Sequence, residues 1–133
     1  MALVTTDAVV LHAFGYLESS RILRLATRDA GVVSVLAKGA RRSSRRFGTA
    51  VDLFAEGQAQ FHAKPGRELH TLAAFDVVRS RPGLGEDLGR FTAASAVAEL
   101  MLRFGRDDPQ PALYEVLVGA HTGVAASAPS VRP

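Results

Sequence analysis

Apolar and β-branched residues in the first part of the chain form short runs, each ending at a glycine or at a polar turn. Runs of this kind predict β-strands over 8–14, 21–27 and 31–38. The turn before Gly31 has the spacing of a β-hairpin, so the second and third strands are expected to pair. The first and third runs are apolar almost throughout, which predicts that neither face of these two strands meets much solvent.

Two further strands are predicted from an alternation with a period of two. Over 52–63 the odd positions are mostly small or apolar and the even positions are mostly polar, which is typical of a strand with one buried face. A lysine, a proline and a glycine at 64–66 indicate a turn. A weaker alternation over 68–78 then predicts a fifth strand that pairs with the fourth.

The predicted pairing of these two strands brings two histidines together. If the apolar faces of both strands match, Phe61 lies opposite Thr71, and His62 lies opposite His70. Two imidazoles across a hairpin can act as metal ligands, but no carboxylate or thiolate at a suitable position completes such a site. We therefore expect no bound metal and no cofactor.

The hydrophobic period changes to 3.6 residues after position 83, which predicts helices. The first helix is expected from 84 to about 106, and the second is expected to begin at Pro111. The apolar stripe of the first helix consists of Leu84, Leu88, Phe91, Ser95, Ala98 and Leu102, and is widened by Ala94, Val97 and Met101. The stripe of the second helix consists of Leu113, Leu117 and Ala120.

Five strands followed by helices are typical of a small barrel with a helical appendage. The long connection between the third and fourth strands favours the OB-fold among such barrels. We therefore predict a mainly β chain with a five-stranded OB-fold barrel over 1–80, a partial helical domain over 81–123 and a flexible tail over 124–133. Two helices cannot enclose a core of their own, so we also expect either self-association through 84–120 or a frayed second helix.

Composition excludes several classes of protein. The chain has 133 residues, of which 47% are hydrophobic and 22% are charged, as in ordinary globular domains. Without cysteine it has no disulfide, no thiolate nucleophile and no cysteine-ligated zinc. No apolar run is long enough to cross a bilayer and the N-terminus lacks the pattern of a signal peptide, so a cytoplasmic location is expected. No nucleophile–base spacing and no phosphate-binding loop is present, which predicts that the protein is not an enzyme.

The net charge of +3 conceals one strongly basic segment. No acidic residue occurs between Asp29 and Asp52, and this interval holds Lys38, Arg41, Arg42, Arg45 and Arg46, followed by Phe47. Cations at this density repel one another unless they meet a polyanion, and an adjacent aromatic ring can stack on a nucleic-acid base. The alternative is a solvated loop that is charged only for solubility. Both interpretations fit the composition.

Two residues outside this segment are candidates for the same surface. Arg24 lies within the second strand, where it either extends the cationic surface or discourages edge pairing as an exposed strand charge. Arg28 at the end of that strand is interpreted as an exposed charge. Tyr16 is a candidate stacking platform, whereas Phe54 and Phe61 are more typical of the core of a small barrel.

Several short motifs follow one another in an order that is more specific than any one of them. They are Ala8-Val9-Val10-Leu11, Tyr16, Glu18, Ile22-Leu23, Thr27, Gly31, Ala37-Lys38-Gly39-Ala40-Arg41, Phe47-Gly48, Phe54, Glu68-Leu69, Thr71-Leu72 and Ala98-Glu99-Leu100. In this order they resemble the N-terminal part of the RecO family of bacterial recombination mediators, which act in DNA repair. The resemblance covers most of the chain, from about Ala8 to Leu102.

The resemblance implies an OB-fold followed by a helical domain, and binding of single- and double-stranded DNA with promotion of strand annealing. It also implies a RecR-type partner and loading of the recombinase onto DNA coated with single-strand binding protein, in the bacterial cytoplasm at the nucleoid. The family's cationic surface maps onto the five cations of the segment 38–46. Family members are roughly twice as long, so DNA binding is expected to carry over better than partner binding.

Three functions remain in competition on these grounds. The first is a DNA-binding OB module of a recombination mediator. The second is an RNA-binding OB module, since the same basic loop binds any flexible polyanion. The third is a protein-interaction domain whose basic loop docks the acidic tail of a partner. Competition between DNA, RNA and an acidic peptide separates the three.

Overall fold

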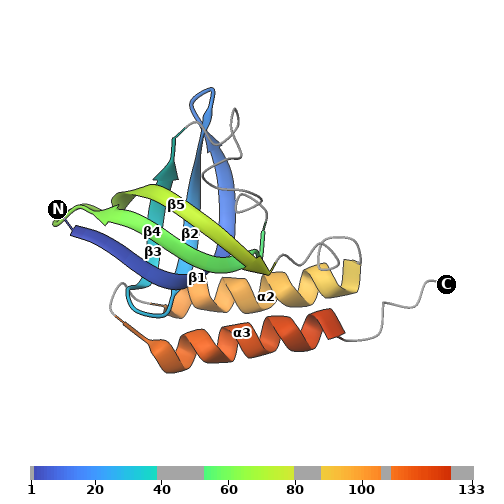
Figure 1. Cartoon of the computed structure of the whole chain (residues 1–133). Helices are drawn as coiled ribbons and strands as arrows, with labels where there is room; N and C mark the ends of the chain where they lie inside the picture. The colour runs from blue at the N-terminus through green and yellow to red at the C-terminus, as the bar shows by residue number, and fades with distance from the viewer. Residues whose placement is uncertain (1, 39–52, 80–87, 106–108, 127–133) are drawn as a thin grey trace.

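The computed structural model describes residues 2–38, 53–79, 88–105 and 109–126, and five strands and two helices lie in these ranges (Figure 1). The strands are β1 (Ala2–Tyr16), β2 (Ser20–Thr27), β3 (Gly31–Ala37), β4 (Glu56–Ala63) and β5 (Leu69–Arg79), and the helices are α2 (Leu88–Phe104) and α3 (Pro111–Ala126). Neither helix is long and apolar enough to cross a membrane.

The five strands close into a barrel in the order β1-β2-β3-β5-β4. β1 is long enough to pair with β4 through its N-terminal half and with β2 through its C-terminal half, both in antiparallel fashion. β3 and β5 pair in parallel and complete the ring. A five-stranded barrel of this order, followed by helices, is the OB-fold predicted from the sequence, and that prediction is confirmed.

Two apolar cores explain why some strands are apolar at consecutive positions. Ala8 and Val10 of β1 point into the barrel, where Phe61 and Phe75 are the bulkiest neighbours. Val9 of the same strand points outward into a second cluster formed with the two helices. β1 is therefore buried on both faces at this point, as its sequence predicts.

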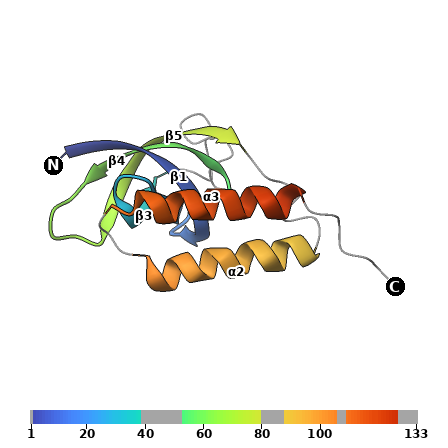
Figure 2. The ribbon, with the colours of Figure 1, turned by 90° about the horizontal axis from the view of Figure 1, so that it is seen from below.

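The helices lie side by side and antiparallel beneath the barrel (Figures 1 and 2). The side chains that α2 buries are Ala94, Ala98 and Met101, and those that α3 buries are Tyr114, Leu117 and His121. Packing against the barrel supplies the core that two helices alone lack. α3 rests on the barrel as well as on α2, whereas the expectation of self-association or a frayed second helix rested on the helices alone and stays a prediction.

Several predicted boundaries need correction. β1 begins at Ala2 rather than at position 8, because its first half is held by pairing with β4. β4 begins at Glu56 rather than at 52, because Phe54 has a left-handed backbone with φ of 68° that interrupts the extended chain. α3 continues to Ala126, so 124–126 is helical and not part of a tail.

The predicted helical stripe is also displaced. Leu88 at its start is 74% exposed, and the buried side chains of α2 begin only at Ala94. On α3 the predicted Ala120 is half-buried, and His121 beside it is completely buried. The barrel lies against a line of α2 that is rotated from the most apolar one, since small alanines allow a closer approach than leucine does.

The predicted register of β4 and β5 is wrong near the turn. Phe61 lies opposite Leu72 and His62 lies opposite Thr71. The pairing shifts by one residue between Gln60 and Phe61, and such a bulge changes which residues face each other. His62 and His70 are therefore not cross-strand partners.

Candidate nucleic-acid interface

A bulge in β1 decides which side chains reach the outside of the barrel. The pairing of β1 with β2 shifts between Val10 and His12, so the alternation of side chains changes phase there. Before the bulge Val9 and Leu11 face the helices, and after it Ala13 packs against the interior of the barrel. The even-numbered residues that follow the bulge therefore lie on the outer surface.

This outer surface carries exposed aromatic rings. Phe14 and Tyr16 are each 42% exposed. The His12 ring lies 5.3 Å from the ring of Phe14, measured between centroids. Exposed aromatic rings held on a strand are the usual stacking platforms for unpaired bases. The candidate Tyr16 is thus accompanied by Phe14, which the sequence analysis did not single out as a ligand contact.

The surface continues across β2 and β3 as two rows of cross-strand partners. His12, Arg24 and Ser34 form the first row, and Phe14, Ile22 and Leu36 form the second. Leu23 and Leu25, which alternate with the β2 members of these rows, are completely buried inside the barrel. We call the six residues of the two rows, together with Tyr16, the β1–β2–β3 face.

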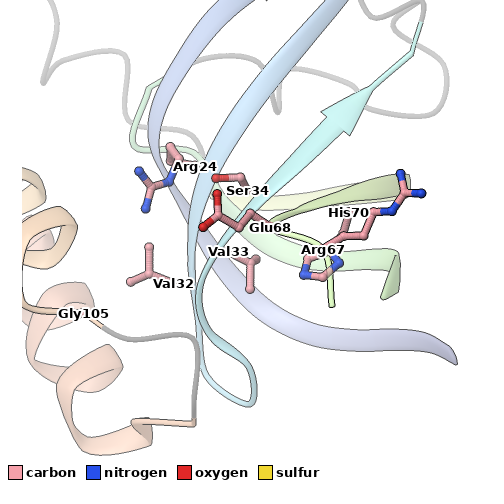
Figure 3. Close-up of a pocket in the computed structure, with 8 residues that line it drawn as sticks. All are labelled: Arg24, Val32, Val33, Ser34, Arg67, Glu68, His70 and Gly105. Atoms are coloured by element: carbon pink, nitrogen blue, oxygen red, sulfur yellow. The ribbon is translucent and has the colours of Figure 1, made fainter. Parts of the chain in front are cut away.

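A cleft of about 410 Å³ opens beside the first row (Figure 3). It is lined by Arg24, Val32, Val33, Ser34, Arg67, Glu68, His70 and Gly105. The turn between β4 and β5 contributes Arg67 and Glu68. The Nε atom of Arg24 is buried and has no hydrogen-bond partner within the described part of the chain. Arg24 thus brings a positively charged guanidinium group to the lining of this cleft.

A second hollow of about 430 Å³ lies next to the cleft and adds two lysines. Lys38 follows the end of β3 and Lys64 follows the end of β4, and Arg67 lines both hollows. Together with Arg24, these residues place four cations around the two hollows. In OB-folds the face of strands 2 and 3, together with the β4–β5 loop, is where oligonucleotides bind.

His70 has a structural part in this surface. Its Nδ1 accepts a hydrogen bond from the backbone N–H of Lys64 at 3.0 Å. Its ring also stacks on the buried ring of Phe61, with centroids 5.6 Å apart. His70 thereby fixes the β4–β5 turn that carries Arg67. In the described ranges, no three His, Cys, Asp or Glu side chains are grouped so that they could hold a metal ion.

The structure brings together three of the predicted site residues. Lys38, Arg24 and Tyr16 all belong to this surface, and Lys38 is exposed. The remaining predicted residues, Arg41, Arg42, Arg45, Arg46 and Phe47, lie outside the described residues. Their prediction stands untested, but the segment that contains them starts directly after Lys38.

Other candidates from the sequence do not belong to the surface. Phe54 and Phe61 are buried in the two cores, as expected. The expectation that Arg28 is a free strand charge is wrong. Its Nε donates to Asp7 at 3.1 Å and its Nη1 donates to Glu115 at 2.8 Å. The hydrogen bonds that Arg28 donates to Glu115 and Asp7 raise its pKa well above the ordinary range.

The sequence analysis missed the contributions of Phe14, Ser34, Lys64 and Arg67. A signal was present for two of them, because Lys64 and Arg67 put two cations into the short turn that joins the last two strands. In an OB-fold that turn borders the ligand surface. Phe14 and Ser34 had no such signal, since their outward direction depends on the bulge and on the β2–β3 pairing.

Comparison with known proteins gives one consistent result. The family model described as "Recombination protein O N terminal" matches residues 1–81. A protein of Salinibacter ruber named DNA repair protein RecO is 38% identical over 120 residues, which cover 90% of this chain and 46% of that protein. One of the same name from Anaeromyxobacter dehalogenans is 40% identical over 127 residues, covering 95% of this chain and 50% of the relative. The chain spans about half the length of the curated relatives it matches.

Proposed function

The chain belongs to the RecO family, and from this premise we propose that it acts in DNA repair and recombination as a DNA-binding OB-fold module. The observation that carries the proposal is the β1–β2–β3 face, on which Phe14 and Tyr16 lie beside a row of cations. Bases of a single strand would stack on the two rings, and phosphates would contact Arg24, Lys38 and Arg67.

The mechanism requires no covalent chemistry and no cofactor. The barrel holds the stacking platforms and cations in place, and the basic segment 39–46 adds further phosphate contacts. Binding of this kind neutralises phosphate charge and keeps bases unpaired, which supports annealing of complementary strands and loading of a recombinase. A RecR-type protein and the single-strand binding protein are the proposed partners in the bacterial cytoplasm, at the nucleoid.

The proposal is tested by fluorescence anisotropy with a labelled single-stranded oligonucleotide over a range of salt concentrations. If about five phosphates are neutralised, log K falls with log[salt] at a slope of about −3.5. Replacing Arg41, Arg42, Arg45 and Arg46 together by alanine should weaken binding and flatten the slope. Arg79→Ala is the control, because Arg79 pairs with Glu56 on β4 and lies outside the face.

A second variant separates stacking from charge. Phe14→Ala combined with Tyr16→Ala should weaken binding roughly tenfold or more and leave the salt slope unchanged, because stacking contributes about 1–3 kcal/mol per base. The exposed Val78→Ala on β5 is the matched control. If neither set of variants changes the affinity, the interface lies elsewhere on the molecule.

Competition experiments decide between the proposed ligand and the two alternatives. Unlabelled DNA and RNA of equal length and an acidic peptide are each added to the preformed DNA complex. The exposed rings of Phe14 and Tyr16 favour a ligand with bases over an acidic peptide. Displacement by the peptide at the same charge concentration as DNA would indicate a protein-docking surface, and preferential displacement by RNA would indicate an RNA-binding module.

A further inference from the structure

The cleft beside the β1–β2–β3 face contains a carboxylate that the proposed binding of phosphates does not use. Glu68 is exposed, and it lines both the cleft and the neighbouring hollow. Among the residues that the structure describes, it makes no ion pair with Arg24 or Arg67. A carboxylate repels phosphate groups, so Glu68 opposes a ligand that brings only phosphate to the cleft. A ligand suited to the cleft therefore carries hydrogen-bond donors as well.

The cleft places this acceptor and a donor around one space. Arg24 and Glu68 both line it, together with Ser34, and in Figure 3 the Glu68 carboxylate points toward the side on which Arg24 lies. An ionised carboxylate only accepts hydrogen bonds, and a guanidinium only donates them. A flat group that presents donors along one edge and acceptors along the next edge matches this arrangement.

The apolar part of the lining suits the face of a ring. Val32 and Val33 line the cleft and are only 7% and 6% exposed. Gly105 follows the end of α2, and a Cβ there would overlap the side chain of Val32, so the chain after α2 lies directly against β3. The volume of about 410 Å³ falls within the roughly 300–1,000 Å³ that is usual for small-ligand pockets. The cleft therefore has room for a nucleobase and aliphatic side chains for its ring to contact.

We propose that the cleft binds the base of a guanine nucleotide within a single strand, an inference that rests on the proposed function and names the base that this surface prefers. Guanine carries N1–H and an N2 amino group side by side, and these donate to the two carboxylate oxygens of Glu68. Its O6 and N7 accept the bidentate contact that arginine makes to guanine, here from Arg24. A guanidinium has further N–H donors, so Arg24 can contact a neighbouring phosphate at the same time.

The other bases match these two side chains less well. Adenine and cytosine each offer one amino group and thymine offers one ring N–H, whereas guanine offers two adjacent donor groups to a carboxylate. A strand reaches the cleft without leaving the β1–β2–β3 face, because Arg24 and Ser34 are cross-strand partners on that face and also line the cleft. Neighbouring bases can therefore stack on Phe14 and Tyr16 while guanine occupies the cleft.

Fluorescence anisotropy with labelled thymidine oligonucleotides that differ in one central base tests the proposal. The whole chain should bind the strand with a central guanine roughly tenfold more tightly than the all-thymidine strand of the same length. A central adenine, a purine without the paired donors, should give a much smaller gain. Replacing guanine by hypoxanthine, which lacks the N2 amino group, or by 7-deazaguanine, which lacks N7, should remove most of the preference.

A variant of Glu68 tests the residue that distinguishes the bases. Glu68→Gln should lose the preference for guanine, because an amide offers only one acceptor oxygen. It should bind the all-thymidine strand at least as tightly as the wild type does, because a negative charge has been removed from a basic surface. Asp76→Asn is the matched control, since it removes the same charge from an exposed position on β5 that does not line the cleft, and it should keep the preference.

The outcomes distinguish this inference from the proposed function. Equal binding of the guanine and all-thymidine strands by the wild-type chain, or an equal gain with adenine, overturns the guanine pocket and leaves DNA binding in place. A preference for guanine that persists in Glu68→Gln also overturns it, because guanine is then recognised elsewhere. Failure of the wild-type chain to bind any of the strands overturns the proposed function, and this inference with it.

Discussion

Arg28 is the residue that connects the barrel to the helices most directly. It follows the end of β2 and binds a carboxylate on each side, Asp7 of β1 and Glu115 of α3. Its guanidinium also lies over the ring of Tyr114, 4.9 Å from the ring centroid. Hydrogen bonds between charged groups and a cation over an aromatic face both favour one fixed geometry. Arg28 thus sets the position of α3 against the barrel.

The hydroxyl of Tyr114 should titrate at unusually high pH. Burial raises the pKa of Tyr114 well above its ordinary range, and the negative charges of Glu56 and Asp7 add to this effect. Because the folded-state pKa is raised, the contribution of Tyr114 to stability is complete below its unfolded pKa and is lost as the pH rises toward the folded value. An ultraviolet absorbance titration should show a late phase that disappears in Tyr114→Phe. A late phase that persists in this variant would contradict the assignment.

Single residues of the candidate site were predictable to different degrees. The chemistry of the basic segment could be read directly, because cations next to an aromatic residue are visible in the sequence. The sequence did not predict that Arg24 and Tyr16 lie on one surface, because this depends on a bulge in β1 that no local sequence pattern indicates. The burial of His121 was missed for a similar reason. Its Nε2 lies 3.2 Å from the carbonyl oxygen of Ala94, a contact made only when α2 and α3 pack together.

At the scale of elements, turns determined how well a strand could be predicted. β2 and β3 were located within one residue because the turn between them is chemically explicit. Thr27 accepts the N–H of Ala30 and donates to the carbonyl of Gly31, which has φ of 70°. β1 was predicted too short, since its first residues are held by the distant β4. Pairing with a remote strand leaves no local signal in the sequence.

Gly57 on β4 and Gly119 on α3 should respond oppositely to alanine. A Cβ at Gly57 would overlap the backbone oxygen of Asp76 and lie 2.8 Å from the ring of Phe75. Gly57→Ala should therefore destabilise the chain by about 1–3 kcal/mol. A Cβ at Gly119 would meet nothing within 4 Å, so Gly119→Ala should stabilise the chain by about 0.5–1 kcal/mol through helix propensity. Urea denaturation measures both.

The free energies of unfolding of the two glycine variants also check the register of β4 and β5. Gly57 lies opposite Val77, next to Asp76, only if the strands pair as described. If Gly57→Ala is as stable as the wild type, β4 and β5 do not approach each other at this point as closely as described. A destabilising Gly119→Ala would instead show that the outer side of α3 is covered at that position.

At the scale of the whole molecule, the two cores are joined through shared strands. β1 contributes Ala8 and Val10 to the interior and Val9 and Leu11 to the cluster between the barrel and the helices. Loss of the helices would expose the second cluster and leave one face of β1 without cover. The barrel and the helices are therefore expected to unfold together, whereas the sequence alone suggested an independent barrel with weakly held helices.

Leucine-to-alanine changes at two helical positions test this cooperativity. Leu117 is 1% exposed and packs in the second cluster, whereas Leu88 is 74% exposed at the start of α2. Leu117→Ala should cost about 2–5 kcal/mol, because it leaves a cavity in that cluster, and Leu88→Ala should change the free energy of unfolding by at most about 0.5 kcal/mol. Hydrogen exchange should then show reduced protection in the strands as well as in α3 of Leu117→Ala. If only α3 loses protection while the strands exchange as slowly as before, the barrel folds independently and the shared strand does not couple the two cores.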